Sequence, residues 1–172
     1  MIIWLVANIL LFFKKGDLEQ SEKWGESAKE LDSYNAAAYV NLGNISYSRN
    51  NMEQAKEFYE IAYENDSTCV EALYNLGLVN KRLRRFEESL GHFMKLETII
   101  RHDPPVLYQL ATLNDIVGDV DQATEWYLQL LGVVPSDPGV LQELGQLLER
   151  EGDKQQAFQY HFDVSVFDFY EC

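Results

Sequence analysis

The sequence predicts an all-α protein made of about five tandem helix–turn–helix units, with about ten helices in total. Three observations carry this prediction. Small residues recur every 34 residues in two separate columns, and leucines keep the same spacing beside the first column. Turn-forming residues recur at that spacing as well. A fixed period of this length indicates repeats that bury their apolar faces against their neighbours.

The recurring residues define how each unit packs. The first small column is Gly43, Gly77, Ala111 and Gly145, and the second is Ala55, Ser89, Ala123 and Ala157. Leucines stand at Leu42, Leu76, Leu110 and Leu144, and the next column holds Tyr59, Phe93, Tyr127 and His161. We expect the small side chains to let the two helices of a unit approach closely. The leucines and aromatic residues should fill the volume around that contact at helical spacing.

Taken in order, the units are expected at residues 2–35, 36–69, 70–103, 104–137 and 138–171, as a single array over 1–172. The first begins with the apolar run from Met1 to Phe13, which is shorter than the roughly 20 residues of a membrane span. The run also lacks the preceding basic residues of a secretory signal. We therefore predict a buried core helix and no membrane span. This unit departs from the pattern at Ile9 and Gly25, and Trp24 is a candidate to fill the missing aromatic position.

The turns inside the units are expected at Gly16, Asn50, Arg84, Gly118 and Gly152. Glycine adopts the left-handed conformation that ends a helix, and asparagine is the next choice. An aspartate follows each of the three turn glycines and is suited to cap the next helix. Two proline-containing segments, 103–105 and 135–138, separate later units. Both ends of the chain are apolar, so we expect a piece of a longer array or ends that dock on a partner.

Composition excludes several functional classes. The chain has 28 acidic and 14 basic residues and a formal charge of −14. This charge disfavours nucleic acid and anionic lipid surfaces, which require clustered lysine and arginine. A basic protein partner fits it better. The two cysteines, Cys69 and Cys172, form no disulfide framework, which predicts a cytoplasmic compartment.

No catalytic constellation is apparent. His92, His102 and His161 do not pair at helical spacing, so metal ligation has no support. The glycines are spread at repeat steps and form no phosphate-binding loop, and no nucleophile elbow occurs. We predict no catalytic residues, no metal, no cofactor and no enzymatic activity.

The period and columns resemble the tetratricopeptide repeat, a helix–turn–helix unit of 34 residues. The resemblance implies a right-handed superhelical solenoid that binds protein partners in a groove lined by the first helix of each unit. Tyrosine and arginine are favoured anchors at such surfaces, and asparagine can bond a peptide backbone. The expected groove residues are Asn41, Asn44, Tyr47, Tyr74, Asn75, Lys81, Arg82, Tyr108, Gln109 and Gln142.

Co-chaperones of this family hold acidic peptide tails in a basic clamp. Asn44 and Asn75 match the two asparagines of that clamp, but Val40, Pro105 and Gln109 occupy its basic positions. This mismatch counts against a co-chaperone. A soluble peptide-binding adaptor, or the non-catalytic repeat segment of a larger enzyme, remain alternatives.

Three stretches that the general repeat does not require carry a narrower resemblance. They are residues 65–67, 122–126 and 151–160. They are similar to the tetratricopeptide subunits of intraflagellar transport complex B, which carries cargo along cilia. The resemblance implies a non-enzymatic scaffold for cilium assembly with other complex B subunits as partners. It also implies a location in the cytoplasm, the cilium or flagellum, and the basal body.

Overall fold

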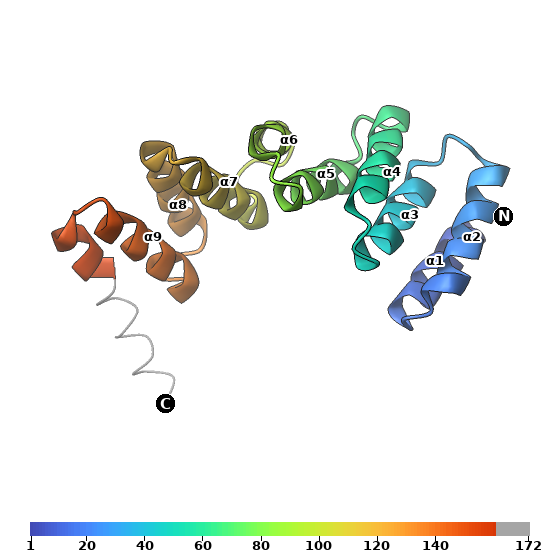
Figure 1. Cartoon of the computed structure of the whole chain (residues 1–172), viewed down its shortest axis with the longest axis horizontal. Coiled ribbons are helices and arrows are strands. Elements are labelled where there is room, and N and C mark those ends of the chain that lie inside the picture. Colours follow the sequence, from blue (N-terminus) through green and yellow to red (C-terminus); the bar gives the residue numbers. More distant parts are fainter. Residues whose placement is uncertain (161–172) are drawn as a thin grey trace. The chain divides into compact units, whose positions relative to one another are not determined.

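The computed structural model describes residues 1–160 and is all-α over that range (Figure 1), which confirms the predicted fold class. The helices are α1 (Ile2–Lys14), α2 (Leu18–Leu31), α3 (Ala36–Ser48), α4 (Met52–Asn65), α5 (Val70–Arg82), α6 (Phe86–Ile99), α7 (Pro104–Val117), α8 (Val120–Val133) and α9 (Pro138–Arg150). Residues 154–160 are helical as well. The chain divides into two compact units, residues 1–92 (unit 1) and residues 93–172 (unit 2). His161, expected in the aromatic column, lies outside the described residues.

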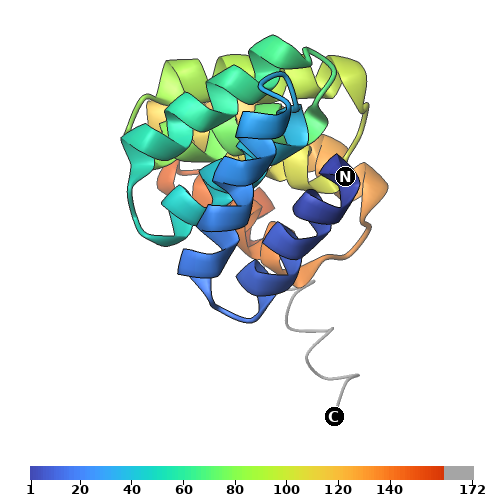
Figure 2. The same ribbon diagram turned by 90° about the vertical axis from the view of Figure 1, so that its right-hand side faces the viewer.

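Unit 1 is built from consecutive helix pairs. Helix α1 packs on α2, and α3 packs on α4. Figure 2 shows the first pair running antiparallel through a short turn. Each pair also packs on the next, because α2 contacts α3 and α4 contacts α5. The first helices of successive pairs meet too, α1 with α3 and α3 with α5.

The turns inside the pairs have the expected backbone conformation. Gly16, Asn50, Arg84, Gly118 and Gly152 all have φ between 59° and 87°. Glycine adopts this region without steric cost, whereas arginine does so rarely. The periodic signal for these helix ends is therefore sound even at Arg84.

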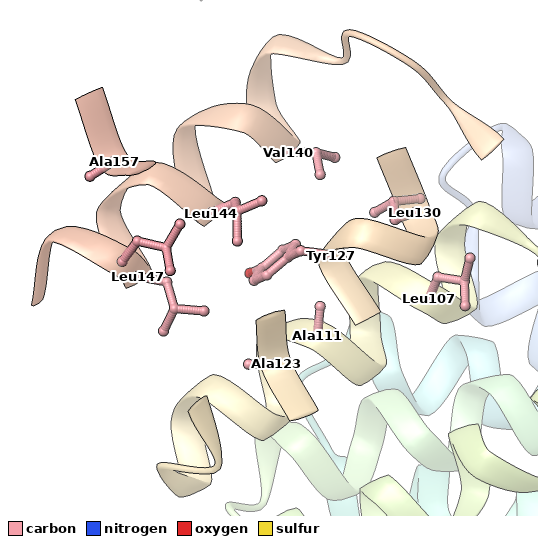
Figure 3. Packing of buried hydrophobic residues seen from close by; sticks show 10 residues of the cluster. Leu107, Ala111, Ala123, Tyr127, Leu130, Val140, Leu144, Leu147 and Ala157 are labelled. Atoms are coloured by element: carbon pink, nitrogen blue, oxygen red, sulfur yellow. The ribbon is translucent and has the colours of Figure 1, made fainter. Parts of the chain in front are cut away.

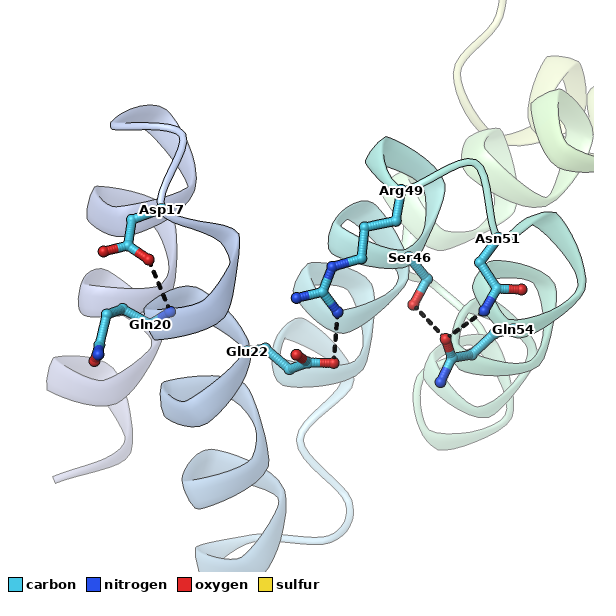
Figure 4. A network of polar contacts seen from close by, with 7 residues as sticks. All are labelled: Asp17, Gln20, Glu22, Ser46, Arg49, Asn51 and Gln54. Carbon is cyan, nitrogen blue, oxygen red and sulfur yellow. Dashed lines mark hydrogen bonds and ion pairs between the residues drawn. The ribbon is translucent and has the colours of Figure 1, made fainter.

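Aspartate capping holds as predicted (Figure 4, for Asp17). The Asp17 side chain accepts a hydrogen bond from the backbone N–H of Gln20, at 3.0 Å. Asp119 and Asp153 accept equivalent bonds from residues three positions later. Each bond satisfies a helix N-terminal donor that has no partner within the helix.

The small columns lie in the helix–helix contacts. Gly43 is buried, and a Cβ added there would lie 2.4 Å from Cε1 of Tyr59. Ser89, in the second column, is fully buried and its hydroxyl donates to the carbonyl oxygen of Gly77 at 2.7 Å. The remaining members are also buried, namely Ala55, Ala111, Ala123, Gly145 and Ala157.

The first pair solves the packing problem differently. Ile9 stands where the other pairs have a small residue, and it is 0% exposed. Gly25 stands at the aromatic position, and its ideal Cβ would lie 2.5 Å from Cδ2 of Leu42 in α3. The large and small residues have thus exchanged helices. Trp24, the candidate for the missing aromatic position, is partly buried against the core of this pair and also packs edge-on against Trp4, with ring centroids 5.1 Å apart.

Helix α1 is buried on one side only, which corrects the expectation of a buried core helix. Leu5 and Ile9 face the core, but Ile3 is 81% exposed and Trp4 is 58% exposed. The prediction failed because an apolar run shows that a helix is apolar all round, not that every side has a neighbour. Within residues 1–160, no helix is long and apolar enough to cross a membrane.

Unit 2 has one core made by α7, α8, α9 and residues 154–160 (Figure 3). Tyr127 of α8 belongs to this core together with Ala111 of α7 and Leu144 of α9. Its side chain is 1% exposed. Asp103 and Asp137 cap α7 and α9 just ahead of the prolines that begin them. The proline segments therefore start helices, as the sequence indicated.

Candidate functional site

A pocket of about 210 Å³ lies between α1, α3 and α5 in unit 1. It forms because first helices of successive pairs contact one another. Its lining residues are Phe13, Asn44, Tyr47, Ser48, Tyr59, Asn75 and Leu78. Three of the predicted groove residues, Asn44, Tyr47 and Asn75, therefore come together at one place.

A polar network crosses this pocket and centres on Asn44. The amide oxygen of Asn44 accepts a hydrogen bond from the Tyr59 hydroxyl at 2.7 Å and another from Asn75 Nδ2 at 3.1 Å. The Asn44 amide nitrogen donates to Glu71 Oε1 at 3.4 Å. Burial is the main cause that raises the pKa of Tyr59, with Glu71 adding to it. Tyr59 therefore stays protonated and donates through the neutral range.

Two basic residues lie in the last turn of α5, the helix that carries Asn75. The guanidinium of Arg82 lies 5.8 Å from the ring centre of Tyr47, within cation–π range. Lys81 is half-buried, and this burial lowers its pKa. Arg82 thus lies beside Tyr47, which supplies aromatic surface to the pocket, while Asn44 and Asn75 supply amide groups. Such a site suits an extended peptide whose carbonyl groups need donors.

The other predicted groove residues lie in several environments. Tyr74, Tyr108 and Gln109 are half-buried, and Gln142 is exposed. Asn41 is only 7% exposed, and its amide donates to the Ala37 carbonyl oxygen of its own helix at 2.7 Å. Asn41 therefore presents little surface to a ligand. Burial, with Glu143 second, raises the pKa of Tyr108.

The predicted groove set lacks four lining residues of the pocket, and two of them, Phe13 and Tyr59, lie outside α3 and α5. Phe13 stands one repeat length before Tyr47, so the period itself contained the signal. Tyr59 belongs to the aromatic core column, and nothing in its spacing shows that its hydroxyl reaches the pocket. Tyr59 therefore belongs both to the core of unit 1 and to the lining of the pocket.

In unit 2 an open pocket of about 620 Å³ is lined by Asp115 of α7 and by Glu143, Gln146, Glu149 and Arg150 of α9. Here the amides of unit 1 give way to carboxylates. One repeat-related pair illustrates the change, because Asn75 of α5 corresponds to Glu143, two repeat lengths later. Corresponding helices of the two units therefore present different groups, an amide on α5 and a carboxylate on α9.

Comparison with known proteins agrees with this architecture. Residues 36–69, which contain α3 and α4, match the tetratricopeptide repeat family model. MamA residues 41-end from Desulfovibrio magneticus RS-1 superposes with a TM-score of 0.90 at 13% identity, covering 98% of this chain and 96% of that one. The fold is that of the tetratricopeptide-repeat proteins.

Two further tetratricopeptide-repeat structures are similar. PilF from Pseudomonas aeruginosa has a TM-score of 0.82 at 23% identity, covering 96% of this chain and 75% of that one. YrrB, described as having an unusual peptide-binding site, has a TM-score of 0.82 at 19% identity, covering 93% of this chain and 82% of that one. No curated protein matches the sequence. At these identities the likeness shows the tetratricopeptide fold alone.

Proposed function

We propose that this chain is a non-enzymatic scaffold that binds a segment of a partner protein in the pocket of unit 1. The observation that carries the proposal is the paired amides of Asn44 and Asn75, joined at 3.1 Å beside the ring of Tyr47. Asparagine amides present both donors and acceptors, which match the backbone of an extended peptide. Tyr47 and Leu78 add apolar surface for its side chains. We also propose the five units at residues 2–35, 36–69, 70–103, 104–137 and 138–171.

The position of Tyr59 supports binding without large rearrangement. Its buried ring fills the space above Gly43, while its hydroxyl holds the Asn44 amide in one orientation. A ligand then meets amides that are already ordered, which lowers the entropic cost of association.

The experiment compares two tyrosine truncations in the whole chain. Tyr47→Ala removes the aromatic wall of the pocket, whereas Tyr34→Ala removes a tyrosine that is exposed in the α2–α3 turn. Partners captured from cell extract and identified by mass spectrometry should be depleted by Tyr47→Ala and retained by Tyr34→Ala. Circular dichroism of both variants should stay unchanged. Equal capture by both variants would remove the pocket as the binding site.

The narrower function that we propose is that of intraflagellar transport protein 88, the tetratricopeptide subunit of complex B, as a fragment or diverged copy. Its support is the resemblance of residues 65–67, 122–126 and 151–160. In the structure Gln122 and Glu125 are exposed on α8, so packing does not dictate them. The partners would be other complex B subunits, and the location the cilium or flagellum and basal body.

A pull-down from ciliated cells tests this narrower function. Recovery of complex B subunits supports it, and recovery of chaperones alone contradicts it in favour of an adaptor. The Tyr34→Ala and Tyr47→Ala variants serve as the matched pair in the same experiment. Loss of complex B subunits with Tyr47→Ala alone would assign that interaction to the pocket.

A further inference from the structure

The unit 2 pocket between α7 and α9 already contains one guanidinium group. We call the pocket residues Asp115, Glu143, Gln146, Glu149 and Arg150 the acidic notch. Nη2 of Arg150 lies 2.6 Å from Oδ1 and 2.8 Å from Oδ2 of Asp115. The Arg150 side chain is 59% exposed and that of Asp115 is 22% exposed, so solvent screens the ion pair from the arginine side. Arg150 is therefore an occupant that another cation can replace.

A buried hydroxyl lies in the core of unit 2, against α9, the helix that carries most of the acidic notch. Tyr127 of α8 is 1% exposed, and among residues 1–160 its hydroxyl meets no hydrogen-bond partner. Figure 3 shows the phenol oxygen directed toward Leu144 and Leu147 of α9, the helix that also contains Glu143 and Arg150. Burial raises the pKa of Tyr127, Glu143 and Asp115 raise it further, and Arg150 opposes them. Three notch residues thus act on this one hydroxyl.

The corresponding tyrosine in unit 1 is satisfied internally. The Tyr59 hydroxyl donates to Asn44, but two repeat lengths later Thr112 replaces that asparagine. The Thr112 hydroxyl donates to the Gln109 carbonyl oxygen instead, at 3.2 Å. A buried hydroxyl without a partner is destabilising, because folding removes the hydrogen bonds that it makes to water in the unfolded chain. In unit 2 the unpartnered Tyr127 hydroxyl therefore occurs in the same unit as the acidic notch, where carboxylates replace the amides of the unit 1 pocket.

We propose that the acidic notch takes up an arginine or lysine side chain from a basic segment of a partner protein, displacing Arg150 from Asp115. The incoming cation donates to the carboxylates of Asp115 and Glu143, and one of its N–H groups reaches the Tyr127 oxygen once Arg150 has left. The formal charge of −14 attracts such a segment at long range. This inference rests on the proposed function and adds the chemical class of the ligand.

The probe for this inference is a fluorescein-labelled peptide of alternating arginine and glycine, with a glutamate–glycine peptide as control. Fluorescence anisotropy measures its binding to the full chain at physiological salt. Asp115→Asn with Glu143→Gln should weaken binding about tenfold, the effect of losing a charge-assisted hydrogen bond. The matched control is Glu57→Gln with Glu64→Gln on α4, two exposed residues that change the net charge equally. The control should bind almost as the parent does.

Two further variants separate the acidic notch from general charge attraction. Arg150→Ala should tighten binding, because the internal competitor is gone. Its control, Arg49→Ala, removes an arginine that pairs with Glu22 in unit 1 at 2.8 Å and should tighten it less. Tyr127→Phe should weaken binding of the arginine peptide while circular dichroism stays unchanged.

Specific outcomes would overturn the proposal. Equal weakening by the α7/α9 pair and the α4 pair would mean that only the overall charge matters. Unchanged or weaker binding with Arg150→Ala would show that Arg150 is no competitor. If Asp115→Asn lowers helicity, Glu143→Gln alone provides the same test. If the peptide-binding results fail but Tyr47→Ala still depletes the cellular partners, only the acidic-notch inference is removed. If the peptide-binding results hold but Tyr47→Ala depletes no partner, the unit 1 pocket is removed as the binding site.

Discussion

The Tyr59 hydroxyl donates a 2.7 Å hydrogen bond to Oδ1 of Asn44, and this bond ties the core of unit 1 to its surface. The same column supplies Tyr127 in unit 2, whose hydroxyl has no such acceptor within the described part of the chain. One packing position therefore serves two different purposes. The rings fill equivalent volumes, but only one phenol orients a neighbouring amide.

This contrast predicts opposite effects of the same substitution. Tyr59→Phe removes a hydrogen bond and should lower the free energy of unfolding by about 1 kcal/mol. Tyr127→Phe removes a buried hydroxyl that has no partner among residues 1–160, and should leave stability equal or higher. Urea denaturation of both variants measures the difference. Equal destabilisation would mean that Tyr127 has an acceptor after all.

Gly43 should not tolerate even one added methyl group. A Cβ at this position would lie 2.4 Å from Tyr59 Cε1, and ring atoms of a buried tyrosine cannot move aside freely. Gly43→Ala should therefore cost about 1–3 kcal/mol of unfolding free energy through overpacking.

Gly91 is the matched control for this change, since among the described residues no atom outside its chain neighbours and its own helical backbone lies within 4 Å of its ideal Cβ. Gly91→Ala lies inside α6 and should stabilise the chain by up to about 1 kcal/mol through helix propensity. Thermal denaturation gives both values. A neutral Gly43→Ala would contradict the close packing of α3 on α4.

Ala123→Glu should unfold unit 2. Ala123 is 0% exposed within the core cluster of that unit, so the carboxylate would be buried without a partner. We expect a loss of about 3–5 kcal/mol, comparable to leaving one charge of a buried pair uncompensated. Gln122→Glu adds the same charge at the exposed neighbour and should be nearly neutral. Limited proteolysis and circular dichroism distinguish them, and intact helicity in Ala123→Glu would mean that the orientation of α8 is wrong.

Arg84 offers a stabilising substitution. Its φ of 59° is a left-handed conformation that costs a side-chain-bearing residue about 1–2 kcal/mol. Arg84→Gly should raise the unfolding free energy by about 1 kcal/mol once the greater freedom of glycine in the unfolded chain is subtracted. Gly118→Ala, at φ 84°, should lower it by a similar amount. Both shifts are readable as changes in the urea midpoint, and a destabilised Arg84→Gly would refute the strain argument.

Periodicity made the turn positions predictable, even where the residue type was a poor guide. Arg84 alone does not indicate a left-handed turn, but its register with Gly16 and Gly118 does. The left-handed residues His102 and Ser136 lie in the α6–α7 and α8–α9 connections and were not predicted. Each precedes a capping aspartate, and that neighbour was the available signal.

Size exchange and side-chain hydrogen bonding were beyond the reach of the sequence. Ile9 and Gly25 each break a column, and only the contact of Gly25 with Leu42 shows that the two departures compensate. Asn41 stands at a groove position, yet its amide bonds to its own helix. The repeat position of a residue predicts where it lies along the helix. The exposure of that residue depends on how the neighbouring helix packs.

The three tryptophans are divided between the units, with Trp4 and Trp24 in unit 1 and Trp126 in unit 2. Their ultraviolet emission therefore contains two separable signals. Replacing Trp126 with phenylalanine leaves a chain whose fluorescence follows the first unit alone, and replacing the edge-on pair leaves the complementary reporter. The thermal unfolding of each unit can therefore be followed separately by its own tryptophan fluorescence.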